Sequence, residues 1–183
     1  MNGDELARFF QALEQEPNTT LKDFFLVALL TGARRANVMA MRWSDLDLKN
    51  ATWKIQETKN ATPQTVPLTE SVLEILQDRR TNTSSFFVFP GKRITGHLVE
   101  PKTAWKRICK AAGIEDVRVH DLRRTMGSWQ AIAGSSPPVI GKSLGHKRQQ
   151  ATAIYSRLDL DPVQASMEKG AATMMKAVNG GKK

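Results

Sequence analysis

The chain has 183 residues, 40% of them hydrophobic, which is enough for one domain with a substantial core. Lysine and arginine outnumber aspartate and glutamate by 27 to 18, which gives a net charge of +9. This charge favours a nucleic acid as partner, or second an anionic membrane. A basic protein with no polyanionic partner has the same charge balance. The single cysteine excludes an internal disulfide, and without a signal peptide or a membrane-spanning apolar run we expect a cytoplasmic location and no membrane partner.

Hydrophobic periodicity predicts helices at the start of the chain and a small sheet after them. Three helices are expected first: residues 4–15, a largely buried helix that Thr20 caps, and a short third helix. A turn at 43–47 then leads to two strands, at 52–57 and 64–68, because these residues alternate in polarity and are rich in β-branched side chains.

The second half of the chain is predicted to be helical apart from its loops. The expected helices lie at 69–80, 102–112 and 121–133, at a short segment that begins near Pro138, and at 161–178. This is a single domain over 1–178 with a frayed tail at 179–183, and its class is mainly α with a small antiparallel β-sheet (α+β). The last helix has apolar residues that suit packing either on this chain or on a neighbouring protomer: Val163, Ala165, Met167, Met174 and Met175.

The chain has a single tyrosine, Tyr155, beside seven phenylalanines and four tryptophans. Tyr155 follows two histidines, His120 and His146, and the arginine pair Arg123 and Arg124. A phenol has a pKa of about 10, so it attacks at neutral pH only with a base or cations beside it. The arrangement predicts a nucleophile that attacks a phosphodiester, whereas position alone favours a tyrosine held in the core by its ring.

Arginines and histidines are the side chains that such an attack requires. Two guanidiniums, those of Arg34 and Arg123, can hold the non-bridging oxygens through charge-assisted hydrogen bonds. His120 lies three residues before Arg123, which predicts that both lie on one face of a helix. His120 and His146 titrate near neutral pH and can move protons, and Lys59, between the strands, can protonate a departing oxygen. Each residue alone is more commonly a solvated charge or a structural side chain.

The sequence disfavours two other phosphate chemistries. Gly141-Lys142-Ser143 is similar to the end of a nucleotide-binding P-loop, but a serine at position 136 and the two prolines after it remove the glycine and the amides that the loop needs. Metal-dependent cleavage needs clustered carboxylates or histidines, and the nearest patterns, Asp45-x-Asp47 and Asp159-x-Asp161, have no histidine beside them. The sequence therefore predicts chemistry without a metal, a nucleotide or another cofactor.

Taken in chain order, these segments resemble the catalytic domain of the tyrosine recombinases, the phage integrase family. The segments that carry the resemblance are Thr31-Gly32-Ala33-Arg34, Met41-Arg42-Trp43-Ser44-Asp45-Leu46-Asp47, Thr58-Lys59 before Thr65-Val66-Pro67-Leu68, Val119-His120-Asp121-Leu122-Arg123-Arg124-Thr125, and Leu144-Gly145-His146 with Ile154-Tyr155. The tyrosine follows the last histidine by nine positions, as it does in family members. Each segment is weakly specific alone, but together they match in order over nearly the whole chain.

The resemblance implies the tyrosine recombinase catalytic-domain fold and a site-specific recombinase that acts on double-stranded DNA. It implies that Tyr155 forms a 3′-phosphotyrosyl link, that Lys59 is the general acid, and that four residues surround the phosphate: Arg34, His120, Arg123 and His146. It also implies a homotetramer on DNA, a monomer without DNA, and a bacterial or phage source with the protein at the nucleoid. A type IB topoisomerase-like nicking-closing enzyme and a non-catalytic DNA-binding module are the alternatives.

The sequence departs from the family pattern in two ways. Asn37 stands where many members have glutamate, and it brings no charge to support Arg34. The chain also begins at the first helix of the catalytic domain, so we expect the family's N-terminal core-binding domain to be absent and DNA binding to be weak. Other basic residues are expected to contact backbone phosphates: Lys92, Arg93, Arg124, Lys142, Lys147 and Arg148.

Overall fold

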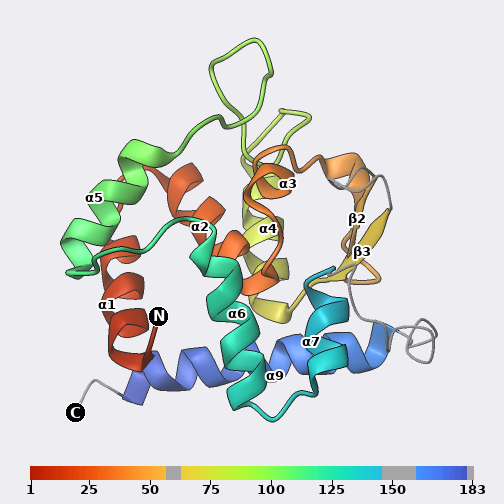
Figure 1. Ribbon diagram of the computed structural model, residues 1–183. Helices are drawn as coiled ribbons and strands as arrows, with labels where there is room; N and C mark the ends of the chain where they lie inside the picture. The colour runs from red at the N-terminus through yellow and green to blue at the C-terminus, as the bar shows by residue number, and fades with distance from the viewer. Residues whose placement is uncertain (57–62, 146–159, 181–183) are drawn as a thin grey trace.

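The computed structural model describes residues 1–56, 63–145 and 160–180, which form mostly helices with a three-stranded antiparallel sheet at one side (Figure 1). The first elements are α1 (Gly3–Glu14), α2 (Thr19–Thr31), α3 (Arg35–Met39), the 3-10 helix η1 (Trp43–Asp45), β1 (Leu46–Asp47), β2 (Thr52–Ile55) and β3 (Gln64–Pro67). The later elements are α4 (Glu70–Thr81), α5 (Lys102–Ala112), α6 (Asp121–Ile132), α7 (Pro137–Ser143) and α9 (Leu160–Gly180). The class is mainly α with a small antiparallel sheet, as the sequence predicts.

Two asparagines begin the first helices by accepting from backbone N–H groups that a helix start leaves without a partner. The Asn2 side chain accepts from the backbone N–H of Glu5, and the Glu5 carboxylate accepts from that of Asn2, both at 2.8 Å. Asn18 accepts from the N–H of Leu21 at 3.1 Å and begins α2. The prediction that Thr20 caps this helix is therefore wrong, because the chain has already turned into the helix at Thr20.

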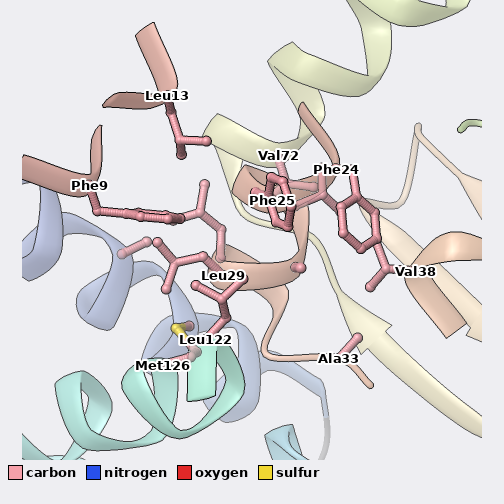
Figure 2. Close-up of a cluster of buried hydrophobic side chains, with 14 of the residues drawn as sticks. Phe9, Leu13, Phe24, Phe25, Leu29, Ala33, Val38, Val72, Leu122 and Met126 are labelled. Atoms are coloured by element: carbon pink, nitrogen blue, oxygen red, sulfur yellow. The ribbon is translucent and has the colours of Figure 1, made fainter. Parts of the chain in front are cut away.

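Helix α2 forms the centre of the core, and other helices pack around it (Figure 1). Its side chains are apolar on nearly every face, which is typical of a helix that is covered all round. Figure 2 shows Phe9 from α1 and Leu122 and Met126 from α6 converging on Phe25 and Leu29 of α2. Burial of this apolar surface, at roughly 25 cal/mol per Å², fixes α2 and with it the chain that leaves its C-terminal end.

The sheet has the order β1-β2-β3, and its two longer strands form a hairpin in which Thr52 pairs with Pro67 and Ile55 pairs with Gln64. Trp53 and Ile55 are buried, so one face of the sheet covers the core. The sequence predicts these two strands slightly too long. It predicts only a turn where η1 and β1 lie, because a strand of two residues is too short to show alternation.

Helix α9 packs along α1, α6 and α7 of the same chain and runs across the bottom of the view in Figure 1. The Glu168 carboxylate accepts from the N–H of Glu70 at 2.9 Å and so ties the start of α4 to α9. Ala165 is exposed, but other apolar residues of α9 are buried at helical spacing: Val163, Met167, Ala171 and Met174. Across the described ranges, no helix has the length and apolar character needed to cross a membrane.

Candidate active site

The centre of the candidate site is Arg123, which lies in the first turn of α6 and is only 6% exposed. Its Nη1 donates to the carbonyl of Gly32 at 2.7 Å, and its Nη2 donates to the carbonyl of Leu144. These partners are 91 and 21 residues away in sequence, at the end of α2 and just after α7. One side chain therefore joins three of the segments that carry the motifs.

Gly32 allows this close approach. It ends α2 in the left-handed conformation, with a φ of 60°, which glycine adopts without steric cost. A Cβ atom at Gly32 would lie 2.7 Å from Cδ2 of Leu144, so the leucine side chain would have to shift to admit it. On α6, a Cβ atom at Gly127 would lie 3.1 Å from Cδ1 of the same leucine. The two glycines therefore leave room for Leu144 between α2 and α6, where its carbonyl reaches Arg123.

Arg34 brings a second positive charge to this place. It follows Gly32 by two residues, precedes α3 and is half-buried. Burial, and after it repulsion from the charge of Arg34, lowers the pKa of Arg123 to about 10, so the guanidinium stays protonated at neutral pH. Neither arginine forms an ion pair within the ranges that the structure describes. Two neighbouring cations without a carboxylate make a site that favours an anion such as a phosphodiester.

His120 is placed differently from the expected pair on one helix face. Helix α6 begins only at Asp121, so His120 precedes the helix and is exposed, whereas Arg123 is buried. Asp121 holds the turn, because its carboxylate accepts from the N–H of Arg118 at 2.8 Å and pairs with Arg124 at 3.0 Å. His120 therefore lies at the start of the helix that carries Arg123, with its ring open to solvent.

The side chain of Gln64 connects the hairpin with the end of α7. Its Nε2 donates to the carbonyl of Ser143 at 3.2 Å, and its amide occupies the space that a side chain at Gly145 would need. Lys59 lies five residues before Gln64, and His146 follows Gly145 directly. The contact therefore holds together the two chain segments that lead to Lys59 and His146.

The predicted site residues fall into three groups. Arg34 and Arg123 lie together, and His120 lies at the start of the same helix as Arg123. Five further residues lie outside the described residues: Lys59, His146, Tyr155, Lys147 and Arg148. The remaining predicted DNA-contact residues are all exposed, two between α4 and α5, one on α6 and one on α7: Lys92, Arg93, Arg124 and Lys142.

No residue pattern in the sequence indicates the groups that contact Arg123 and the hairpin. The carbonyls of Gly32 and Leu144 are backbone atoms, so no residue type signals their role. Gln64 is a polar residue at the start of a strand, which is too common to indicate a function. Asn37, which replaces the usual glutamate, has a buried Nδ2 with no hydrogen-bond partner among the described residues and lines a cleft of about 410 Å³ between α3 and β2.

The order and packing of these elements define a known class of domain. The integrase from mycobacterium phage Brujita has the same fold, with a TM-score of 0.71 at 23% sequence identity, over 89% of this chain and 56% of that chain. The fold is that of a tyrosine recombinase catalytic domain.

Sequence comparison gives the family. Residues 1–161 match the phage integrase family, and the chain belongs to that family, which confirms the resemblance carried by its motifs. The chain is 29% identical over 172 residues to prophage integrase IntF of Escherichia coli strain K12, covering 91% of this chain and 37% of IntF. It is 31% identical over 155 residues to the shufflon-specific DNA recombinase of Escherichia coli, covering 84% of this chain and 38% of that protein. The chain thus spans less than two fifths of the length of these two relatives.

Proposed function

We propose that the chain is the catalytic domain of a site-specific DNA recombinase that cleaves and rejoins DNA through a 3′-phosphotyrosyl intermediate. The observation that carries the proposal is the buried Arg123, whose guanidinium joins the ends of α2 and α7 beside Arg34. Membership of the phage integrase family supports the reaction type. The name of one relative, the shufflon-specific DNA recombinase, supports DNA as the substrate.

In this proposal Arg34 and Arg123 bind the scissile phosphate. The two carbonyls accept from two of the N–H groups of Arg123. Its other N–H groups have no partner among the described residues, and in this proposal they donate to the non-bridging oxygens. Guanidiniums that are already in place stabilise the charge that builds on these oxygens in the transition state more than they stabilise the ground state. His120 and His146 complete the set of donors around the phosphate.

Tyr155 is the nucleophile of the proposed reaction. Its oxygen forms a bond to phosphorus and loses its proton to a base, while the bond from phosphorus to the 5′ oxygen breaks. Lys59 gives a proton to the departing 5′ oxygen. The phosphodiester that links the tyrosine to the DNA 3′ end replaces the one that linked the two nucleotides. Because the number of ester bonds is unchanged, a 5′-hydroxyl can reverse the reaction and rejoin the strand without ATP.

The proposed partner is double-stranded DNA, with a homotetramer on DNA and a monomer in its absence. Charge supports this choice, because the chain carries a net charge of +9. The cations that would contact backbone phosphates are the exposed Lys92, Arg93, Arg124 and Lys142, together with Lys147 and Arg148. Such contacts give an affinity that falls with salt and carry little sequence information.

The test is incubation of the chain with a nicked suicide DNA substrate, from which the short 5′ fragment diffuses away after cleavage. We expect a covalent protein–DNA adduct on a denaturing gel from the wild-type chain and none from Tyr155→Phe. The substitution removes only a hydroxyl, so the variant should still bind the duplex and serves as the control for binding.

Two outcomes would contradict the proposal. A wild-type chain that binds the duplex and yields no adduct would be a non-catalytic DNA-binding module. An adduct accompanied by relaxation of supercoiled DNA, with no joining between two duplexes, would identify a nicking-closing enzyme in place of a recombinase.

A further inference from the structure

A cleft that contains none of the candidate active-site residues lies between η1 and the segment that follows α4, and two arginines line it. Hydrogen bonds join the two sides: Trp43 N donates to the carbonyl of Phe86 at 3.2 Å, and Val88 N donates to that of Met41 at 2.9 Å. The cleft has a volume of about 680 Å³. In Figure 1 the segment between α4 and α5 reaches out at the top of the view, on the opposite side from α9.

Two arginines of this cleft have no carboxylate partner among the described residues. The Arg80 guanidinium lies 5.0 Å from the centre of the Trp43 ring, and the Arg42 guanidinium lies 5.6 Å from that of Phe87. Rings hold cations in place but do not neutralise them. Neither arginine has an ion pair in the described part of the chain, and no aspartate or glutamate among the described residues lines the cleft.

The polar groups around these arginines are also suited to an anion. The Trp43 side-chain N–H is buried and has no acceptor among the described residues, which is unusual for a buried donor. The Ser85 hydroxyl oxygen accepts from the N–H of Phe87 at 3.1 Å, so its own O–H remains able to donate, and Ser84 is exposed beside it. The two serine hydroxyls and the two arginines therefore present donors and positive charge to whatever enters the cleft.

We propose that this cleft binds a backbone phosphate of duplex DNA, as a second contact outside the candidate active site. The proposal rests on the proposed function. Arg42 also lines the neighbouring cleft along α3, the helix that starts directly after Arg34, so this one arginine borders both clefts. Phe86 is 87% exposed at the edge of the cleft and offers an apolar surface to a sugar of the backbone.

The experiment measures the affinity of the chain for a fluorescein-labelled duplex as a function of salt, with Tyr155→Phe in every variant so that no adduct forms. We expect the double variant Arg42→Gln, Arg80→Gln to lower the magnitude of the slope of log affinity against log salt by about 0.9, the value for one lost phosphate contact. The double variant Lys106→Gln, Lys110→Gln removes the same charge from exposed positions on α5 and should keep the parent slope.

A second variant tests the cleft without removing the cation–aromatic contacts, whose loss could unfold the chain. Ser84→Glu adds a carboxylate at an exposed position in the cleft and should weaken binding by repulsion, whereas Gln11→Glu, exposed on α1, adds the same charge and should not.

The outcomes separate this inference from the proposed function. A parent chain that binds no duplex overturns both. A parent that binds, with an unchanged slope in the arginine variant and unchanged affinity in Ser84→Glu, overturns only the second contact and leaves an acidic protein segment as the anion that fits the cleft.

Discussion

Arg123 combines two roles that commonly fall to different side chains. Its hydrogen bonds to the carbonyls of Gly32 and Leu144 join two chain segments, while in the proposed reaction its charge, next to that of Arg34, binds the phosphate. Both roles depend on the planar, forked shape of a guanidinium as much as on its charge. The residue should therefore tolerate no substitution, including one that keeps the charge.

Arg123→Lys tests that statement. A compact ammonium cannot reach both carbonyls, so we expect the rate of adduct formation on suicide DNA to fall about 100-fold, as when a preorganised donor is lost from other active sites. Single-turnover kinetics measure the rate. The matched control is Arg8→Lys on α1, since the Arg8 Nε donates to the carbonyl of Ala112 at 2.8 Å outside the site. Similar rates for the two variants would contradict the dual role.

Gly32→Ala tests the close packing of the Leu144 side chain against Gly32 at the end of α2. The substitution imposes a left-handed backbone on alanine, which costs about 1–2 kcal/mol, and it also drives a Cβ atom into Leu144. Gly113, at the end of α5, has the same φ of 60°, and a Cβ atom added there would meet nothing within 4 Å, so Gly113→Ala carries the backbone cost alone. Urea unfolding should show a larger loss of stability for Gly32→Ala. An equal loss in the two variants would mean that the contact with Leu144 is unimportant.

Among the secondary-structure elements, the hairpin of β2 and β3 is joined to the end of α7 by a hydrogen bond from the side chain of Gln64. Gln64→Leu keeps the bulk of the side chain but removes the donor to the Ser143 carbonyl, a loss of about 1 kcal/mol. We expect adduct formation to slow by about fivefold, the equivalent of about 1 kcal/mol, and the melting temperature to fall by only about 2–4 °C. Thr65→Val, exposed on the next position of β3, is the control and should leave the rate unchanged. Faster or unchanged cleavage by Gln64→Leu would separate the hairpin from the reaction.

The elements also show what the sequence can and cannot predict. Long amphipathic segments such as 102–112 are predicted to the residue, because their apolar spacing is repeated over several turns. The strand β1 is missed because two residues carry no period, and the cap of α2 is assigned to Thr20 because Asn18 and Thr20 are both suitable residue types. Periodicity thus predicts the bodies of the elements well and their ends poorly.

At the scale of the whole molecule, packing brings together motif residues that are far apart in the sequence, and no local sequence pattern shows which ones meet. Gly32 and Arg123 are 91 residues apart, and only the packing of α2 against α6 brings them together. The identity of Arg34 and Arg123 as candidate residues can be predicted from sequence, because their chemistry suits a phosphate. The carbonyl partners of Arg123 cannot, since a backbone acceptor is present at every residue.

The most direct measurement of the central claim is the chemical identity of the covalent link. The adduct formed on suicide DNA would be digested with protease and nuclease, and the modified peptide would be sequenced by mass spectrometry. The account predicts a nucleotide attached through its 3′-phosphate to Tyr155. A nucleotide attached through a 5′-phosphate, or attached to any other residue, would contradict it.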